Sequence, residues 1–365
     1  MAMALLTYIR TFSIIYVKDK ILDFYFNLLT ASVKMTTNKL SRLLCFLLIF
    51  SVSYVGADVG RPGKKDVPTE VYITVYIIDL DNVSSADQNF TANVFIKMQW
   101  NDPRLKHNKP GPISMDIKEI WHPRIQFLNQ QRLWFTIDDV VTVSQDGDVT
   151  FRERAWGDFS QPLNLHDFPF DSQYFNVQIV PLGYSHNEVK LIQNTKTKSG
   201  MAETFSVADW EILNYEAKPF KYSPFNGDIY MNGFQFSLHA KRESNYFITT
   251  IIIPLVMIVM MSWAVFWIDP QQSGTQMSVA MTTMLTLIAF RFAVAASLPN
   301  ISYLTRMDIV ILSSTILVFA SLLEVVITSV LSLSNKLELA RRVDKVSRWV
   351  FPIVFIITFV RGLFL

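Results

Sequence analysis

The sequence predicts an extracellular antiparallel β-sandwich of the immunoglobulin-like kind, followed by a bundle of four membrane-spanning helices. Half of the 365 residues are hydrophobic and only 18% are charged, which is too apolar for an ordinary soluble protein of this length. Residues 58–244 are mixed in composition and rich in turns, whereas residues 245–365 fall into four apolar blocks. Each block is long enough, at about 1.5 Å per residue, to cross or nearly cross a hydrocarbon core of about 30 Å.

Residues 1–57 have the pattern of a leader that ends in a secretory signal peptide. A short basic start after Met35 precedes the apolar run 43–52 and the small-residue sequence Val55-Gly56-Ala57. Cleavage is therefore expected after Ala57. A genuine N-terminal anchor helix in residues 1–34 is the alternative.

Short segments of the second region alternate between apolar and polar residues. A period of two predicts strands with one buried face. The clearest predicted strands are 71–78, 90–100, 139–154, 175–182 and 234–240. The Asp146-Gly147 pair inside the third is a two-residue hairpin signal. Many strands with Pro and Gly turns between them, and little helical periodicity, are typical of an antiparallel β-sandwich. The single cysteine, Cys45, lies in the leader, so the sandwich depends on its core and not on a disulfide.

The apolar blocks place the membrane spans and their orientation. The predicted spans are 246–268, 275–298, 305–333 and 346–365, with a short cytoplasmic link at 334–345. An exported domain ahead of four spans leaves the C-terminus outside. Lys and Arg exceed Asp and Glu around the link, as in cytoplasmic loops. We therefore expect a multi-pass protein of the plasma or bacterial inner membrane, with its N-terminal domain and C-terminus on the extracellular or periplasmic side.

One face of the second span carries a distinct stripe. Its members recur at steps of four and three: Ser278, Thr282, Leu285, Ala289, Phe292 and Ala296. The stripe is hydroxylic at the inner end and mostly apolar, with bulky members, further out, which suits the lining of a narrow water path with a hydrophobic constriction. The alternative is a lipid-embedded helix whose hydroxyls bond their own carbonyls one turn back.

Three motifs resemble, in order, signatures of the Cys-loop receptor superfamily. They are Trp100-Asn101-Asp102-Pro103-Arg104-Leu105, then Trp121-His122-Pro123 with Phe127-Leu128-Asn129, then His166-Asp167-Phe168-Pro169-Phe170-Asp171-Ser172-Gln173. Where eukaryotic receptors place the two loop cysteines, this chain has Gln161 and Phe175. Without that disulfide and with a short third link, the chain is similar to the prokaryotic pentameric ligand-gated ion channels from Val71 to Leu365. The resemblance implies a homopentamer, in which each subunit assembles with four identical subunits around an axis. Each subunit lines the axial pore with its second span.

The resemblance also implies an agonist site between neighbouring sandwiches and a coupling site at the membrane boundary. The agonist positions are Phe95, Leu128, Leu182, Tyr184, Tyr222 and Tyr230. The coupling positions are Asp87, Phe168, Pro169, Asp171, Arg242 and Pro299. Aromatic rings hold an ammonium group by cation–π attraction, but two positions that are usually aromatic in animal receptors are leucines here. An amine, another small molecule or a proton therefore stays open as the agonist.

Ion choice is less strongly indicated. The inner mouth of the implied pore holds Gly274, Thr275 and Gln276, with neither the glutamate ring of cation-passing relatives nor the Pro-Ala-Arg sequence of anion-passing ones. Cations are favoured because no basic ring stands there. In the third span, Glu324 is an intramembrane carboxyl that we expect to pack against the neighbouring helices. A protonated carboxyl and an ion pair with Arg348 are both open for it.

Other function classes find little support in the sequence. A net charge of +2 gives no sign of a nucleic-acid partner. The histidines have no metal-ligand spacing, and no nucleophile motif or phosphate loop occurs, so we expect no enzyme activity, metal site or cofactor. Permeant ions, membrane lipid and a small agonist are the expected partners. The alternative is a membrane-anchored β-sandwich sensor or adhesion module that conducts nothing, which needs only one of the four spans.

Overall fold

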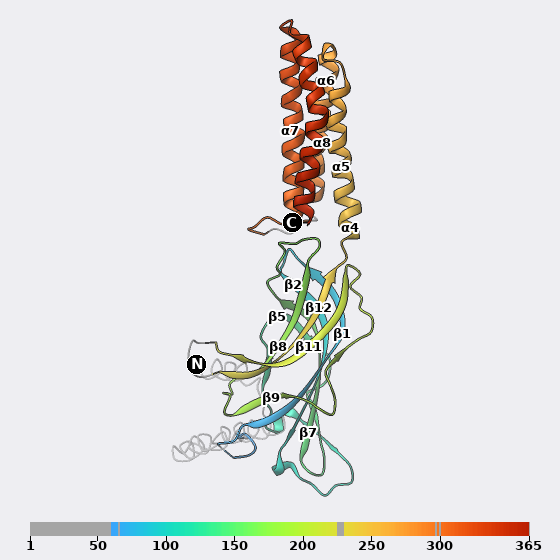
Figure 1. Ribbon diagram of the computed structural model, residues 1–365. Helices are drawn as coiled ribbons and strands as arrows, with labels where there is room; N and C mark the ends of the chain where they lie inside the picture. The colour runs from blue at the N-terminus through green and yellow to red at the C-terminus, as the bar shows by residue number, and fades with distance from the viewer. Residues whose placement is uncertain (1–59, 65, 225–229, 296–297, 299–300, 365) are drawn as a thin grey trace, which may run out of the picture. The chain divides into compact units, whose positions relative to one another are not determined.

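The computed structural model describes residues 60–64, 66–224, 230–295, 298 and 301–364, without the side chains of residues 363 and 364. The predicted leader and signal peptide, residues 1–57, lie outside this part of the chain, as do Ala296 and Pro299. Within it, strands come first and helices follow, in the order that the sequence predicts (Figure 1).

The strands form a β-sandwich in which each strand is hydrogen-bonded to a neighbouring strand. They are β1 (Thr69–Ser84), β2 (Asn89–Asn101), β3 (Ile113–Asp116), β4 (Ile125–Phe127), β5 (Gln130–Phe135), β6 (Val140–Val143), β7 (Asp148–Ser160), β8 (Ser172–Pro181), β9 (Val189–Gln193), β10 (Gly200–Met201), β11 (Trp210–Tyr222) and β12 (Met231–Arg242). Their order is β3-β6-β7-β2-β1-β9-β12-β8-β4, with β10 beside β1, β11 beside β12 and β5 beside β7.

Most of these ladders are antiparallel, but not all. The long pairs β1–β2, β2–β7, β8–β12 and β11–β12 are antiparallel, as predicted. Three short pairings are parallel instead: β9 and β10 each run parallel to β1, and β9 also runs parallel to β12. Strand β9 lies between β1 and β12 in the sheet, and β10 lies beside β1. Both are short, and neither carries a long alternating pattern in the sequence.

Alternating side chains build the core. In β2 and β7 every second residue is buried, which is the pattern that predicted them. Aromatic rings fill the interior: the ring centroid of Phe90 lies 5.4 Å from that of Phe159 and 5.3 Å from that of Phe175, and Phe175 lies 5.0 Å from Trp210. The position of one receptor cysteine is therefore occupied by a core ring.

The predicted hairpin joins β6 to β7 and holds the first receptor motif. Gly147 has a φ of +82°, and a Cβ there would lie 2.5 Å from the backbone oxygen of Asp102. The Asp102 N–H in turn donates to the Gly147 carbonyl at 2.9 Å. The buried Asp102 carboxylate pairs with Arg104 at 2.7 Å. Glycine is needed here both for the turn and for this close approach.

Helices make up the rest of the described chain. They are α4 (Asn245–Phe247), continued by a π-helical turn (Ile248–Ile252) into α5 (Ile253–Ala264), then α6 (Ser273–Ala295), α7 (Arg306–Leu333) and α8 (Leu337–Phe364). Helix α7 packs against both α6 and α8, and α5 packs against α6 (Figure 1). Because α8 already begins at Leu337, most of the predicted 334–345 link is helical.

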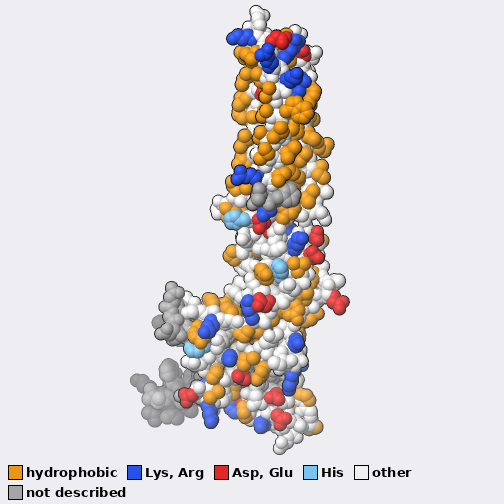
Figure 2. Space-filling model, in the orientation of Figure 1, with side chains coloured by type: hydrophobic (Ala, Val, Ile, Leu, Met, Phe, Trp, Pro, Cys, Tyr) orange, Lys and Arg blue, Asp and Glu red, His pale blue; other side chains and the backbone are white. Residues whose placement is uncertain are grey.

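Length and composition agree with a membrane location. In the described residues, three helical stretches are long and apolar enough to cross a membrane: Asn245–Trp267, Pro270–Ala295 and Arg306–Leu333. The predicted fourth span falls within α8. Figure 2 shows hydrophobic side chains over the bundle, with Lys and Arg gathered at one end, where Lys336, Arg341, Arg342 and Lys345 are exposed around the α7–α8 connection.

Candidate functional site

The predicted stripe of the second span lies on an exposed side of α6. Leu285 is 68% exposed and Phe292 is 79% exposed in the single subunit. Ser278, Thr282 and Ala289 are exposed as well. The opposite side of α6 is buried against α5 and α7, through residues such as Ala280, Thr283 and Leu287. The subunit therefore leaves the whole described stripe without a covering element.

Threonine hydroxyls in and beside the stripe make local bonds. The Thr282 hydroxyl donates to the Ser278 carbonyl at 2.7 Å, and the Thr286 hydroxyl donates to the Thr282 carbonyl at 2.8 Å. These are the back-bonds of a helix in an apolar environment. Back-bonding uses each hydroxyl hydrogen and leaves the oxygen free to accept, so the stripe can still be wetted.

The inner end of α6 differs from the expectation. Gln276 is fully buried and does not face the stripe. Its amide donates to the Ile268 carbonyl at 2.8 Å, which fixes the connection between α5 and α6. Asp269 pairs with Arg341 at 3.0 Å. Gly274 and Thr275 remain exposed, so these two are the predicted mouth residues that can still line an opening.

A buried ion pair lies in the sandwich where β12 ends. Arg242 Nε lies 2.7 Å from Asp171 Oδ1, and the second contact, from Nη2 to Oδ2, is 3.2 Å. Both side chains are buried. The guanidinium lies between two rings, 4.2 Å from the Trp210 centroid and 5.0 Å from that of Phe168. Gln173 donates to the same carboxylate at 2.7 Å. The predicted pair is thus present, and its ring partners include Trp210, which the sequence did not single out.

Asp87 does not reach this pair. Its exposed carboxylate accepts from the Ser84 hydroxyl at 2.8 Å. The neighbouring Ser85 takes its place, because Arg242 Nη2 donates to the Ser85 hydroxyl at 3.0 Å. The β1–β2 loop therefore contacts the ion pair, as expected, but through a hydroxyl and not through a carboxylate.

The loop that contains Phe168 and Pro169 also contacts the helices. Both residues are buried, and the Phe168 ring packs on Phe247 of α4 with centroids 4.8 Å apart. The first N–H groups of α7 donate to this loop, from Arg306 to the His166 carbonyl at 3.0 Å and from Met307 to the Phe168 carbonyl at 3.2 Å. The loop thus supplies acceptors for orphan donors of a helix terminus.

A stacked pair lies beside that junction. The rings of His166 and Tyr303 lie 4.1 Å apart and 7° from parallel. The Tyr303 hydroxyl accepts from the Leu165 N–H at 3.0 Å and donates to the Leu163 carbonyl at 3.3 Å. Sequence reasoning missed Tyr303 because it belongs to none of the three motifs. Its contacts with the loop around His166 arise only in the folded chain.

Five of the six predicted agonist positions lie on or beside β4, β8, β11 and β12. Tyr230 stacks on His186 with centroids 3.9 Å apart, and Lys221 Nζ lies 4.8 Å from the Tyr230 centroid. Tyr184 accepts from the Trp121 indole at 3.0 Å. Leu182 is exposed, Leu128 follows β4, and Tyr222 ends β11 opposite Met231.

Phe95 lies apart from the other five. It is on β2, where its cross-strand neighbours are Tyr76 of β1 and Arg154 of β7. Strands β1 and β9 separate β2 from β12 and β8 in the sheet. One subunit therefore does not bring the six positions together.

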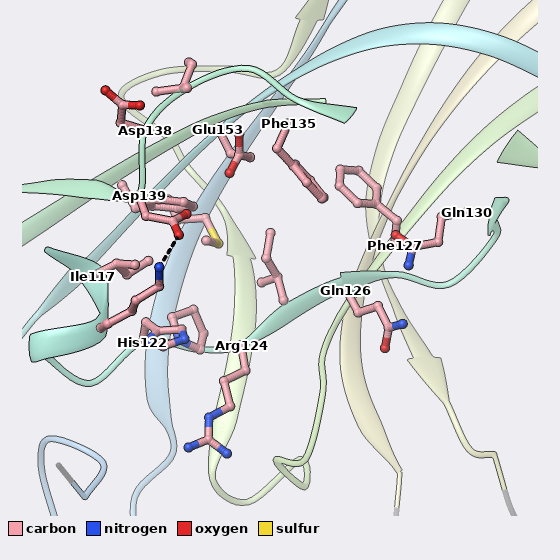
Figure 3. Close-up of a pocket in the computed structure, with 16 residues that line it drawn as sticks. Ile117, His122, Arg124, Gln126, Phe127, Gln130, Phe135, Asp138, Asp139 and Glu153 are labelled. Carbon is pink, nitrogen blue, oxygen red and sulfur yellow. Dashed lines mark ion pairs between the residues drawn. The ribbon is translucent and has the colours of Figure 1, made fainter. Parts of the chain in front are cut away.

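A cavity of about 710 Å³ lies within the sandwich, lined from β2, β4, β5, β7 and the segments between them (Figure 3). Its wall combines apolar side chains, among them Phe127 and Phe135, with an equal number of polar or charged ones. The Glu153 carboxyl is buried in the same wall. Burial raises the pKa of Glu153, which the Arg154 N–H only partly offsets and the nearby Asp139 reinforces. None of the six predicted agonist positions lines this cavity. The sequence gives no signal for it, because its lining comes from separate segments without a motif.

Glu324 is buried in the bundle, but its predicted partner is wrong. Arg348 donates from Nε to the Phe266 carbonyl at 2.8 Å, with its guanidinium 5.7 Å from the Trp267 ring. The neighbours of the Glu324 carboxyl are Asp344 and Ser347 of α8.

Two family models match the chain. The model of the neurotransmitter-gated ion-channel ligand binding domain matches residues 57–244, which contain all twelve described strands. The model of the neurotransmitter-gated ion-channel transmembrane region matches residues 251–338, which contain α6 and α7. The first match agrees with an N-terminal domain outside the membrane. Members of this family are ligand-gated ion channels and not enzymes. The chain therefore belongs to the neurotransmitter-gated ion-channel family, within the pentameric Cys-loop superfamily, and it does so without the loop disulfide.

Proposed function

We propose that five copies of this chain surround an ion pore lined by α6, which opens when a ligand binds between neighbouring sandwiches. One observation carries the proposal: α6 leaves Ser278, Thr282, Leu285, Ala289 and Phe292 exposed while its other side is packed. Exposed hydroxyls gain nothing in lipid, whereas a ring of them wets a narrow passage. On this proposal Leu285, Ala289 and Phe292 form the closed gate, because rings of apolar side chains around one axis expel water.

Thiol accessibility tests the pore directly. The only cysteine of the sequence, Cys45, lies in the predicted leader, so introduced cysteines are the only thiols in residues 58–365. In lipid nanodiscs, we expect a water-soluble thiol reagent to modify Ser278→Cys and Leu285→Cys. The matched control is Ile316→Cys, on an exposed part of α7, which should stay protected by lipid. Equal protection at all three positions would contradict a water path along α6.

Channel recording tests the gate and the ion choice. We expect Leu285→Ser to increase leak or ease activation, because a hydroxyl admits water into the constriction. We propose a preference for cations, since the exposed residues at the inner end, Gly274, Thr275 and Ser278, carry no basic group. Reversal potentials in a sodium chloride gradient measure the preference. A reversal potential that follows chloride would overturn it.

The agonist site is proposed between the face that carries Tyr230 and the face of the next subunit that carries Phe95. Two observations favour a ligand with an acidic group over a quaternary ammonium. Lys221 already lies over the Tyr230 ring, and Arg154 stands beside Phe95. We expect carboxylate ligands to give larger responses than matched amines, and Lys221→Gln to weaken them. Responses confined to amines or to protons would contradict this ligand class.

We further propose a multi-pass plasma-membrane location with α8 as the fourth span. Helix α8 packs on α7 and carries Arg341, Arg342 and Lys345 near its start, which suits a cytoplasmic end. A tag at the C-terminus should then be accessible from outside the cell. Labelling that requires a permeabilised membrane would contradict this topology.

A further inference from the structure

Three buried polar side chains that the proposed pore does not use meet inside the bundle. Gln276 of α6, Glu324 of α7 and Asp344 of α8 are 0%, 8% and 1% exposed. Gln276 Nε2 donates to Asp344 Oδ2 at 3.2 Å. The carboxyl group of Glu324 adjoins that of Asp344, and the Ser347 hydroxyl, also buried, lies beside Glu324. The cluster therefore joins three helices at one point.

Neither carboxylate has an ion-pair partner among the described residues. The nearest basic side chains are used elsewhere: Arg348 bonds the Phe266 carbonyl, and Arg341 pairs with Asp269 and Glu338. A buried charge without a partner costs several kcal/mol. Two such charges in contact require either a cation or bound protons to neutralise them.

The acceptor atoms of the cluster point to the same need. Among the residues that the structure describes, no donor bonds to four of its buried oxygens: Glu324 Oε1 and Oε2, Asp344 Oδ1 and Gln276 Oε1. The amide of Gln276 cannot be turned around, because its nitrogen donates both to Asp344 and to the Ile268 carbonyl. Carboxylate oxygens accept and do not donate, so the two carboxylates cannot satisfy each other.

We propose that Glu324, Asp344 and Gln276 bind one hard divalent cation, such as Mg²⁺ or Ca²⁺, inside each subunit. Such ions prefer carboxylate and amide oxygens. A charge of +2 cancels both carboxylates and gives all four oxygens a partner. A single shared proton would leave one charge uncancelled, and it would leave one Glu324 oxygen and the Gln276 oxygen without a partner.

A bound ion would tie α6 to α7 and α8 near the inner mouth. An effect of the ion on opening rests on the proposed function, because it requires α6 to line a pore. Binding itself does not, and it is measured without any current.

The test uses purified full-length protein in detergent, stripped with a chelator. Adding Mg²⁺ or Ca²⁺ should raise the unfolding midpoint by a few degrees over Na⁺ at matched ionic strength, because the ion binds the folded state. About one metal ion per subunit should remain after buffer exchange, as expected for one site with this ligand set. Asp344→Asn and Glu324→Gln should lose the response. The control Glu338→Gln, on an exposed part of α8, should keep it. The ion with the larger shift identifies the natural occupant.

Two outcomes would overturn the proposal. One is a wild-type protein that ignores divalent ions but loses stability from pH 6 to 9, when Glu324→Gln does not, because a shared proton would then fill the site. The second comes from Gln276→Glu, which is informative even if the other variants do not fold. A third carboxylate should lower the dissociation constant for the divalent ion by about tenfold, and an unchanged constant contradicts direct coordination.

Discussion

Gln161 shows how one side chain stands where related receptors have half of a disulfide. Its amide nitrogen donates to the Tyr174 carbonyl, and its oxygen accepts the Asn176 N–H at 2.8 Å. These bonds lie on either side of Phe175, the other cysteine position. They close the loop of residues 161–175 by hydrogen bonds, while the Phe175 ring fills the core.

We expect Gln161→Leu to lower the free energy of unfolding by about 1–2 kcal/mol, because it leaves the Asn176 N–H without its partner. Urea unfolding followed by tryptophan fluorescence measures the change. Gln161→Glu keeps the acceptor and should cost less. Equal losses in the two variants would show that the accepted bond is not the one that matters.

Glu153 predicts a pH dependence of stability. Its pKa is raised in the folded protein by burial, so the folded state binds this proton more tightly than the unfolded chain does. The resulting contribution to stability is full below the ordinary glutamate pKa of about 4.3 and is lost as the pH rises through the raised value.

Unfolding of Glu153→Gln should therefore depend less on pH than that of the wild type. We expect the variant to gain relative stability as the pH rises above the ordinary glutamate pKa of about 4.3, since it has no carboxyl to ionise. The control is Glu119→Gln. Glu119 is exposed and follows a residue that lines the cavity. Parallel pH profiles for wild type and Glu153→Gln would contradict a raised pKa.

The Asp171–Arg242 pair belongs to the residue scale as well, because its energetics depend on burial. Arg242→Gln should lower the free energy of unfolding by about 3–5 kcal/mol, since it leaves a buried carboxylate unpaired. The double variant Asp171→Asn/Arg242→Gln should lose less than the sum of the single losses. Additive losses would mean that the two groups do not stabilise each other.

At the scale of elements, α7 is the helix that the sandwich holds most directly. Thr305 caps it: the hydroxyl accepts the Asp308 N–H at 3.1 Å, and the Asp308 carboxylate accepts the Thr305 N–H at 2.9 Å. This capping box orders the first turn, whose other N–H groups bond to the loop around Phe168.

Thr305→Ala should therefore destabilise the start of α7 by about 1 kcal/mol. Hydrogen exchange at the Asp308 amide should become faster, while Thr305→Ser should leave it nearly unchanged because serine keeps the oxygen. Unchanged exchange in Thr305→Ala would mean that the backbone bonds to the loop are sufficient to order this turn.

Elements with strong periodicity could be predicted from the sequence, and the others could not. Strands β1, β2, β7, β8 and β12 are each ten residues or longer. Alternation between buried and less buried side chains is strict in β2 and β7 and partial in the other three, and it made these strands predictable. Strands β9 and β10 are too short to carry a period, and their parallel pairing to β1 depends on where long loops return. The ion pair was predictable through the motif around Phe168, whereas Ser85 and Trp210 reach Arg242, and Tyr303 reaches His166, only through the tertiary fold.

At the scale of the whole molecule, one subunit leaves several predicted functional positions uncovered or far apart. The stripe on α6 is uncovered, and Phe95 lies two strands away from the other agonist positions. Both are consistent with a chain that works as part of a ring. Neither the cavity nor the carboxyl cluster could be predicted, because each depends on contacts between elements that are far apart in the sequence.

A pair of exposed tryptophans offers a test of the pentamer. Trp134 of β5 and Trp156 of β7 stack with ring centroids 5.1 Å apart, yet they are 51% and 40% exposed. Large aromatic surfaces that remain exposed in a subunit mark interaction sites. We expect this tryptophan pair to be buried between neighbouring subunits, with Trp134→Glu lowering the pentamer fraction in native mass spectrometry because truncation of a central tryptophan costs about 2 kcal/mol or more per interface. Trp134→Phe keeps an apolar ring and should preserve the pentamer. A circular dichroism spectrum that matches the wild type would show that Trp134→Glu still folds, and a full pentamer population in that variant would place the interface elsewhere.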